Sequence, residues 1–443
     1  MQAPRRRTRV AILGAGGRDF HVFNTRYRHD ADVEVVAFTA TQIPSIENRV
    51  YPPVLAGALY PDGIPIHSED DLDRLVAELG IEEAVFAYSD VSPEHLDAVR
   101  ARVEGAGARF RTFDPVATQL PSMRPCVAVC AVRTGSGKSG VSRYLARVLR
   151  DRGVRVGVLR HPMPYGHLER QVVQRFARIE DLAEQECTIE EMEEYEPHIA
   201  AGGVVFAGAD YLKILGVAEA EADVILWDGG NNDTPFIRPD VWITLLDPLR
   251  AGDELRYFPS LPNLEGAHVL ILAKSDQASP EQMESVRASA AARNPDARVL
   301  LGRSPYTLAD PEAVRGKRVL VVEDGPTTTH GGMGYGAGWL AAREGGAAEI
   351  VDPRPYATGE IAEAFEAYPH LHAILPALGY GERQLVDLER TIRSVPCDAV
   401  VVGTPIDLSR VIRIDQPAVR VTYEYRDGSE PGLAKLVMER LGL

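Results

Sequence analysis

The chain has 443 residues, 45% of them hydrophobic and 25% charged, and its formal net charge is −16. This length predicts two or three domains of ordinary globular composition, and the acidic balance argues against non-specific nucleic-acid binding, because phosphate backbones select basic surfaces. No apolar run reaches about 18 residues and the four cysteines lack paired spacing, so we expect a cytoplasmic protein with reduced thiols and no membrane contact.

The first 118 residues predict a small Rossmann-like α/β domain, 1–118. Buried strands are expected at 9–13, 33–38, 84–87 and 109–113. Helical patterns lie between them at 69–79 and 93–105, and such alternation is typical of a doubly wound sheet. The segment 115–125 contains three prolines and no periodicity, so we place the linker there.

A glycine-rich loop follows the first predicted strand. Gly14-Ala15-Gly16-Gly17 begins like a dinucleotide-binding fingerprint, but Asp19 stands where the third glycine is required, so NAD binding is not expected. The backbone N–H groups of the loop still suit a small polyanionic substrate. The candidate substrate-binding residues here are Arg18, His21, Asn24 and Arg26.

Residues 119–443 predict a larger P-loop NTPase-type domain with a mostly parallel sheet. Buried strands are expected at 126–130, 154–159, 224–227, 241–245, 268–272, 298–301, 319–322, 350–351, 373–375 and 399–402. Helical segments fall between most of them, which is the pattern of a parallel α/β sheet. The pattern allows a subdivision near 303–315, and two short strands within 411–425 precede a final helix from Leu433.

The segment after the first of these strands has the order of a phosphate-binding P-loop. The turn Thr134-Gly135-Ser136-Gly137 leads to Lys138 and Ser139 and then to a helix-compatible stretch. Glycines let backbone N–H groups converge on phosphate oxygens, Lys138 would reach the β- and γ-phosphates, and Ser139 would hold Mg²⁺. Val132 replaces the first consensus glycine, and Arg133 stands where one P-loop subclass carries a further lysine. The alternative is a glycine-rich turn that binds nothing.

Two further motifs would complete a nucleotide site. Asp228 ends an apolar strand, where a Walker B carboxylate holds Mg²⁺ opposite Ser139, although strand-end aspartates are also common without that role. Ala273-Lys274-Ser275-Asp276 resembles a guanine-reading motif with alanine in place of its first residue. Lys274 and Asp276 are therefore candidates for nucleobase contact, and the choice between ATP and GTP stays open.

Three other segments bear on the site. Arg160 and His161 follow the strand at 154–159, at the sheet edge where ligands bind, and are candidates for phosphate contacts, with a surface turn as the alternative. The glycine-rich segment 323–338 contains His330, follows another strand and predicts a backbone nest for anions. The acidic run at 180–196 predicts a solvated helical face, and the less favoured alternative is a role in holding Mg²⁺.

Several longer strings of the chain are rare as sequences. They are Ile12 to Asn24, Tyr51 to Pro53, Val132 to Ser139, Arg160 to Gly166, Trp227 to Asp233, Glu323 to Pro326, Thr329 to Gly332, Ala377 to Gly381 and Gly403 to Asp407. In these strings, which run along nearly its whole length, the chain resembles the cyclic 2,3-diphosphoglycerate synthetase family. The resemblance implies that 2,3-diphosphoglycerate and ATP give the cyclic diphosphoglycerate, ADP and phosphate, with Mg²⁺.

The implied reaction assigns roles to the motifs. One substrate phosphate would accept the γ-phosphoryl group, the second would attack it and expel phosphate, and cations with Mg²⁺ would offset the repulsion between dianions. The expected catalytic residues are Lys138, Arg133, Asp228, Arg160 and His161. Arg133 is the first candidate for stabilising the transferred phosphoryl group, and His330 joins the substrate-binding set. A homodimer is expected, because isologous dimers are the commonest oligomers.

Other functions remain open from the sequence. A GTP-hydrolysing switch or maturation NTPase acting on a protein partner would prefer guanine without stimulation by a small molecule. Lys138, Ser139 and Asp228 together argue against a nucleotide sensor without turnover. A related synthetase could act on another phosphorylated acid, and a nucleotide sensor would lack turnover. The glycine-rich segments at 14–26 and 329–338 favour a synthetase, since a simple switch needs neither.

Overall fold

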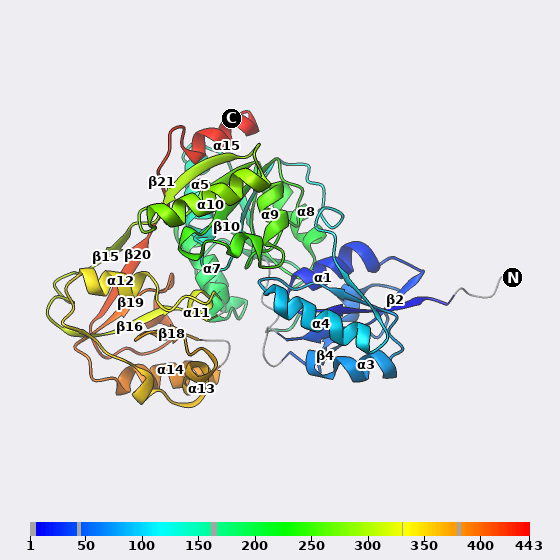
Figure 1. Cartoon of the computed structure of the whole chain (residues 1–443), viewed down its shortest axis with the longest axis horizontal. Helices are drawn as coiled ribbons and strands as arrows, with labels where there is room; N and C mark the ends of the chain where they lie inside the picture. Colours follow the sequence, from blue (N-terminus) through cyan, green and yellow to red (C-terminus); the bar gives the residue numbers. More distant parts are fainter. Residues whose placement is uncertain (1–5, 42–45, 161–165, 330, 379–381) are drawn as a thin grey trace.

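Short apolar runs form the strands of three sheets, and each sheet is the centre of one lobe (Figure 1). The computed structural model describes residues 6–41, 46–160, 166–329, 331–378 and 382–443. We call the lobes the first (strands β1 to β6), the central (β7 to β14 with β21) and the third (β15 to β20). In Figure 1 the central lobe lies at the top and joins the other two, which lie below it on either side.

The first lobe is a mostly parallel sheet in the order β3-β4-β2-β1-β5-β6, with β3 antiparallel to β4. Its strands are β1 (Thr8–Leu13), β2 (Val33–Ala40), β3 (Val50–Tyr51), β4 (Ile64–Ser68), β5 (Glu83–Phe86) and β6 (Arg109–Thr112). Its helices are α1 (Arg18–Val22), α2 (Pro53–Ala56), α3 (Leu72–Glu78) and α4 (Pro93–Gly105). Helix α4 has the bounds expected from the sequence, because Ser92 accepts a hydrogen bond from the His95 N–H and Pro93 fits the first helical position.

The central lobe has the order β21-β14-β13-β12-β7-β11-β8-β10-β9, parallel except for the two edge strands β21 and β9. Its strands are β7 (Cys126–Ala131), β8 (Val156–Leu159), β9 (Gln174–Phe176), β10 (Val204–Ala207), β11 (Val224–Asp228), β12 (Val241–Leu246), β13 (Val269–Leu272), β14 (Arg298–Arg303) and β21 (Arg426–Asp427). Its helices are α5 (Lys138–Arg150), α6 (Glu180–Glu184), α7 (Ile189–Ala200), α8 (Tyr211–Glu221), α9 (Ser260–Gly266), α10 (Pro280–Arg293) and α15 (Leu433–Leu441). Two apolar clusters, one on each face, bury this sheet, as its continuous apolar strands require.

The third lobe has the order β15-β20-β19-β16-β17, with β18 paired to β16 and β15 antiparallel to β20. Its strands are β15 (Tyr306–Leu308), β16 (Arg318–Asp324), β17 (Glu349–Ile350), β18 (Leu375–Ala377), β19 (Ala399–Val402) and β20 (Ala418–Tyr423). Its helices are α11 (Gly325–Thr328), α12 (Ala337–Glu344), α13 (Gly359–Ala367) and α14 (Glu382–Ser394). The chain then returns to the central lobe, where β21 pairs with β14.

The α/β class with a mostly parallel sheet is confirmed. The expectation of one large sheet in residues 119–443 is wrong, because the chain passes from β14 of the central sheet to β15 of the third sheet within 303–315, the range in which the sequence allowed a subdivision. Residues 119–443 therefore carry two sheets. Strands β4 and β10 were not expected, since each is a short run without the alternation of apolar and polar residues that would indicate a strand.

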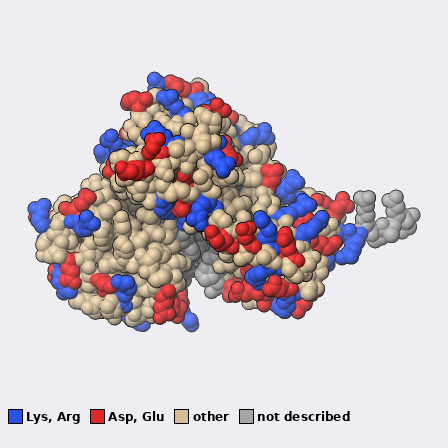
Figure 2. Space-filling model, viewed as in Figure 1, with Lys and Arg blue, Asp and Glu red and all other residues tan. Residues whose placement is uncertain are grey.

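The outer surface mixes charges of both signs. On the face of the first lobe seen in Figure 2, Lys and Arg are interspersed with Asp and Glu, whereas the same face of the third lobe is largely uncharged. Among the helices of the described ranges, none combines the length and the apolar character that crossing a bilayer requires.

Candidate active site

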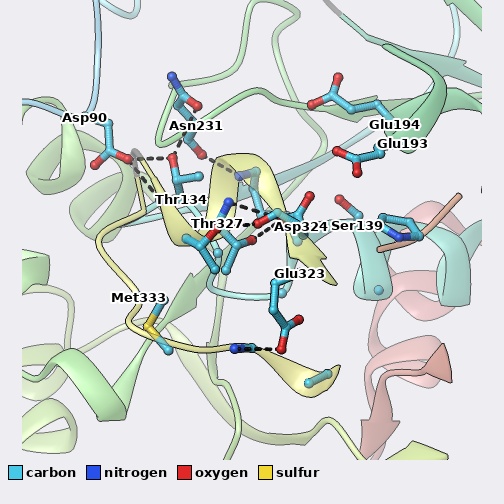
Figure 3. A pocket seen from close by; sticks show the side chains of 18 of the residues that line it. Asp90, Thr134, Ser139, Glu193, Glu194, Asn231, Glu323, Asp324, Thr327 and Met333 are labelled. Carbon is cyan, nitrogen blue, oxygen red and sulfur yellow. Dashed lines mark hydrogen bonds between the residues drawn. The ribbon is translucent and has the colours of Figure 1, made fainter. Parts of the chain in front are cut away.

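A pocket of about 370 Å³ is shared by the three lobes. Its walls come from the segments after β1 and β5 in the first lobe, after β7, β8 and β11 in the central lobe, and from β16 and β19 onward in the third. Ligands of parallel α/β sheets bind at this end of the strands, and the volume suits a small-molecule site. Figure 3 shows Asp90 on one side and Glu193 and Glu194 on the other, with third-lobe residues between them.

The P-loop joins β7 to α5 as the sequence predicts. Gly135 and Gly137 adopt φ angles of 77° and 99°, which only glycine takes readily, and α5 begins at Lys138. Thr134, Gly135, Gly137, Lys138 and Ser139 line the pocket, whereas Ser136 is buried and its hydroxyl donates to the Arg133 carbonyl at 2.8 Å. Loop amides at the start of a buried helix, facing a pocket, are the arrangement that phosphates require.

Lys138 is held inside this pocket before any nucleotide binds. Its ammonium group donates to the carbonyl of Asn231, which follows β11. Burial lowers the pKa of Lys138, and the nearby Asp228 carboxylate partly opposes that effect. An ammonium group that has already lost much of its water is well suited to bind a phosphate.

Arg250, which sequence reasoning missed, connects the P-loop to the third lobe. Its guanidinium donates to the Thr134 carbonyl at 2.8 Å and to the Gly331 carbonyl at 2.6 Å. It also pairs with Asp247 at 2.7 Å, and Asp247 pairs with Lys274 at 3.0 Å. Arg250 and Asp247 therefore connect the P-loop to Lys274, which belongs to the expected nucleobase site.

Arg133 does not line the pocket. Its Nε lies 2.8 Å from Asp90, its Nη1 lies 2.5 Å from Asp253, and the guanidinium packs 3.6 Å from the centre of the Tyr257 ring. Two carboxylates therefore balance its charge, which is not the placement expected of a residue that stabilises a transferred phosphoryl group. Its role in phosphoryl transfer stays a prediction.

Asp90 connects the first lobe to the P-loop. It follows β5 with φ of 62°, and its carboxylate accepts hydrogen bonds from the Thr134 N–H at 3.1 Å and the Thr134 hydroxyl at 2.5 Å. Its own N–H donates to Asn232 at 2.8 Å. This first-lobe carboxylate, which sequence reasoning missed, therefore lies on the loop that would hold phosphates.

Asp228 ends β11 as expected, but its carboxylate does not line the pocket. It is fully buried, its Oδ2 lies 2.9 Å from Arg160 Nη1 and 3.4 Å from His198 Nε2, and Arg160 also donates to Glu194 at 3.0 Å. Burial raises the pKa of Asp228, but Arg160 and His198 outweigh it and hold the pKa below its ordinary value. Asp228 and Arg160 thus balance each other, although Arg160 still lines the pocket.

The described residues offer oxygen ligands but no preformed metal cluster. Within the described ranges, no group of three or more His, Cys, Asp or Glu side chains could hold a metal ion. Mg²⁺ bound with a nucleotide needs fewer protein ligands, because phosphates and waters supply the rest. The Ser139 hydroxyl and the Glu193 carboxylate line the same pocket and are donors of the suitable kind.

The predicted solvated face is wrong at Glu191, Glu193 and Glu196. All three side chains are buried, because helix α7 packs against the central sheet rather than standing in water. Glu193 and Glu194 line the pocket as a result. The acidic run predicted a solvated face because the local sequence does not show whether a carboxylate is solvated or pairs with an arginine from a distant segment.

The expected nucleobase contacts separate in the structure. Lys274, Gln277, Ser304 and Tyr306 line the pocket. Asp276 is exposed, lies outside the lining, and accepts a weak hydrogen bond from the Ser304 N–H at 3.4 Å. Only the lysine of this motif is therefore brought to the site.

The expected substrate-binding residues of the first lobe mostly face elsewhere. Arg18 lines the pocket, but it is buried, pairs with Asp233 at 3.5 Å and donates to the Thr234 hydroxyl at 2.8 Å. His21 stacks on Phe236 with ring centres 4.2 Å apart. Asn24 donates to the Ala209 carbonyl at 2.9 Å, and Arg26 is exposed. These contacts join the first lobe to the central one. His161 and His330 lie outside the described residues.

Two glycine-rich loops that could hold an anion hold the chain's own carboxylates instead. After β1, the Asp19 carboxylate accepts from the N–H groups of Gly16 and Phe20 at 2.9 and 2.7 Å, and also from Gly17. Before α12, Glu323 Oε1 accepts from the N–H groups of Gly336 and Trp339 at 3.1 and 2.7 Å. Burial raises the pKa of Asp19 to about 6 and that of Glu323 to about 7.

Carboxylates outnumber cations around the pocket. The acidic residues in its lining are Asp19, Asp90, Glu193, Glu194, Asp233, Glu323 and Asp324, and the basic ones are Arg18, Lys138, Arg160 and Lys274. Arg18, Arg160 and Lys274 each form an ion pair with a carboxylate. Asp90, Glu194 and Asp233 are likewise paired with arginines, and the remaining carboxylates leave the lining with an excess of acidic groups.

A curated relative decides the family. Arginine synthetase ArcE of Thermococcus kodakarensis is 55% identical over 437 residues, which cover 99% of this chain and 98% of the relative. The chain belongs to the arginine synthetase ArcE family. No family model matches the chain. The identity with cyclic 2,3-diphosphoglycerate synthetases, which the motif strings implied, is not confirmed, and the family relation is to a protein named a synthetase.

Solved structures resemble this member of the ArcE family only distantly. LpxK from Aquifex aeolicus, in complex with ATP, has a TM-score of 0.44 and 14% identity, and the match covers 73% of this chain and 90% of LpxK. A UDP-N-acetylmuramate:L-alanyl-gamma-D-glutamyl-meso-diaminopimelate ligase from Neisseria meningitides has a TM-score of 0.27 and 13% identity, over 67% of this chain and 78% of that one.

Proposed function

We propose that the chain is an ATP-dependent synthetase that forms the guanidino group of arginine or of a close analogue. The observation that carries the proposal is the charge of the pocket, where a P-loop for phosphates opens into a space walled by carboxylates. Such a space attracts a cationic or neutral amino compound and repels a second polyanion. The 55% identity to a protein named arginine synthetase supports the same conclusion.

The simplest ATP-driven route to a guanidinium starts from a ureido group, as in citrulline, the ureido counterpart of arginine. The ureido oxygen attacks the γ-phosphorus of ATP, and the bond from that phosphorus to the β–γ bridging oxygen breaks, which gives an O-phosphorylated isourea and ADP. The nitrogen lone pair of ammonia then forms the C–N bond. The C–O bond breaks, phosphate leaves with the electron pair of that bond, and the phosphate takes up the proton that the nitrogen loses.

The chain's own groups would serve these steps through position and charge. The loop amides from Gly135 to Ser139 and the Lys138 ammonium hold the transferring phosphates in line with the acceptor, and such positioning contributes roughly 7–11 kcal/mol to a reaction of this kind. Ser139 and Glu193 would hold Mg²⁺, which supplies charge neutralisation at the β- and γ-phosphates when bound. The buried walls exclude the water that would hydrolyse the activated intermediate.

ATP is the nucleotide that the site favours. A guanine-reading aspartate must face the base, but Asp276 is exposed and outside the pocket lining. Lys274 lines the pocket with its ammonium group paired to Asp247, so it offers its aliphatic stem to either purine. This placement supports the ATP-dependent reaction over the GTP-hydrolysing switch.

The decisive assay follows phosphorus and arginine in parallel. Protein, Mg²⁺ and ATP would be incubated with citrulline and ammonium in one tube and with 2,3-diphosphoglycerate in another, and ³¹P NMR and amino-acid analysis would be read together. We expect arginine and phosphate in equal amounts in the first tube, and neither with Lys138→Ala. ATP hydrolysis without arginine would contradict the proposal.

Cyclisation of 2,3-diphosphoglycerate is the second candidate, favoured by the strings shared with that synthetase family. In this reaction two phosphates of one small acid must approach each other, so cationic clamps are needed. The clamps expected from the sequence, Arg133, Arg160 and Arg18, are paired with carboxylates of the chain. A new phosphoanhydride resonance in the second tube, without arginine in the first, would establish this alternative.

A further inference from the structure

Among the carboxylates of the pocket, Glu323 has an unusual environment. It is the penultimate residue of β16, and it is only 1% exposed. Asp90, Glu194 and Asp233 each have an arginine partner, and both oxygens of Asp19 accept backbone N–H groups. Within the described residues no Lys or Arg pairs with Glu323, and the hydrogen bonds that hold it reach Oε1.

The second oxygen of Glu323, Oε2, faces two glycines. A Cβ atom at Gly403, after β19, would lie 2.4 Å from Oε2, and one at Gly336 would lie 2.5 Å from it. Both glycines also line the pocket. Any side chain at either position would therefore collide with this oxygen, so the two glycines keep space around it.

Glu323 and the phosphate-binding loop line the same pocket, from the third and the central lobe respectively. Helix α11 follows β16 directly, and the methyl group of Thr327 reaches 3.0 Å from the Cβ position of Gly135 in the P-loop. Figure 3 shows Glu323 below Asp324 and Thr327, with its carboxylate toward the loop that leads to α12. A compound that fills this pocket would thus contact both the P-loop and the β16 wall that carries Glu323.

We infer that Glu323 receives the cationic nitrogen of the substrate, the ammonium that becomes one nitrogen of the guanidinium, and accepts its proton. The inference rests on the proposed function and names the residue that would recognise its nitrogen substrate. A buried carboxylate without a cationic partner is costly, and a cationic ligand supplies the missing partner. Once the carboxyl group has released that proton to water, the carboxylate faces the guanidinium of the product.

The proton balance follows from this position. Ammonium has no free lone pair, so one N–H bond must break and its proton moves to Glu323 Oε2, which becomes a neutral carboxyl group. The freed lone pair forms the C–N bond, phosphate leaves with the electrons of the C–O bond, and the phosphate takes up the second proton that the new nitrogen loses. The pKa of Glu323, raised to about 7, suits a group that takes up a proton near neutral pH.

The titratable groups against Glu323 do not compete for this role. Asp324, next to it on β16, raises the Glu323 pKa further, and its own Oδ2 accepts from the Thr327 N–H at 3.2 Å. The Tyr423 hydroxyl on β20 has a pKa raised by burial and stays neutral. The start of α12 and the end of β19 present glycines and backbone N–H groups on this side.

Binding and turnover of the full chain test the inference. Calorimetry at pH 8 would measure L-arginine affinity for the wild type, Glu323→Gln and Glu349→Gln, a control that makes the same change at an exposed site of the third lobe. The amide of Glu323→Gln keeps an acceptor for the N–H groups. We expect Glu323→Gln to weaken arginine binding at least tenfold and lower kcat/KM for ammonium by about 10²- to 10⁴-fold. ATP affinity should stay unchanged, as should both measurements in Glu349→Gln.

The outcomes separate this inference from the proposed function. If the wild type makes arginine but Glu323→Gln binds arginine normally, the inference about Glu323 fails and the proposed synthetase function stands. If the wild type makes no arginine yet binds it through Glu323, the synthetase reaction fails and the cation site stands. Should Glu323→Gln not fold, a crystal structure of the wild type with L-arginine decides, because a guanidinium more than about 4 Å from Glu323 overturns the inference.

Discussion

Replacing Glu323 by Gln should stabilise the protein at pH 8 and leave its stability nearly unchanged at pH 5. Burial raises the pKa of Glu323 from 4.5 to about 7. A carboxyl group with a raised pKa contributes its full stability below the unfolded pKa and loses that contribution as pH rises through the folded pKa. Each pKa unit corresponds to about 1.36 kcal/mol, so the wild type should lose about 3 kcal/mol between pH 4.5 and pH 7. Gln does not ionise and escapes this loss.

The assay is urea unfolding of wild type and variant at pH 5 and pH 8, followed by circular dichroism and tryptophan fluorescence. Trp339 reports on the surroundings, because its backbone N–H donates to Glu323 and its ring therefore lies on a residue next to this carboxylate. The difference in the free energy of unfolding between variant and wild type should grow by about 3 kcal/mol from pH 5 to pH 8, and no such growth is expected for Glu349→Gln. A difference that is flat with pH, or that favours the wild type at pH 8, would refute the reasoning about Glu323.

Three further changes test other parts of the site. Lys138→Ala should lower turnover by about 10²-fold or more. Its circular dichroism spectrum should be unchanged, because Asp228 keeps Arg160 as its partner. Normal turnover in this variant would contradict the P-loop assignment. Arg18→Ala leaves Asp233 buried without its partner and should lower the free energy of unfolding in urea by about 3–5 kcal/mol. Arg6→Ala, which removes an exposed pair with Glu82, should lower it by less than about 1 kcal/mol. Equal losses in the two variants would contradict the buried role of Arg18. Asp276→Asn should change the KM for ATP by less than about twofold in steady-state kinetics, because its side chain lies outside the pocket, and a tenfold change would restore Asp276 as a base-reading residue.

The P-loop was predictable because its evidence is local. An apolar strand, glycines at the turn, and Lys138 with Ser139 at the start of a helix follow one another along the chain, and the structure keeps that order in β7 and α5. Helix α4 was equally predictable, since Ser92 and Pro93 determine its start. Such features depend on neighbours within a few residues.

The partners of the charged side chains were not predictable. Arg133 meets Asp90 and Asp253, and Arg160 meets Asp228 and Glu194, through contacts between segments far apart in the sequence. A sequence shows that an arginine follows a strand, but not whether a phosphate or a carboxylate of the chain will balance it. Sequence reasoning therefore identified the expected cationic clamps as residues near the site, but it missed the carboxylates of the chain that neutralise them.

The glycine-rich loops show the same limit. The sequence correctly indicated backbone N–H groups at 323–338, but it could not tell what would accept their hydrogen bonds. The structure supplies Glu323, which stands at the start of that very segment. A carboxylate at the end of an apolar strand, ahead of a glycine-rich stretch, is the signal that could have revealed it.

The sharing of one pocket by three sheets has a thermodynamic consequence. A ligand that touches the first, central and third lobes binds only while all three are folded and in contact, so its binding free energy opposes the unfolding of each. At a ligand concentration of about 100 times Kd this linkage amounts to about 2.7 kcal/mol. Lobes that could otherwise unfold independently would then unfold together, so bound substrate would make the unfolding of the whole chain cooperative.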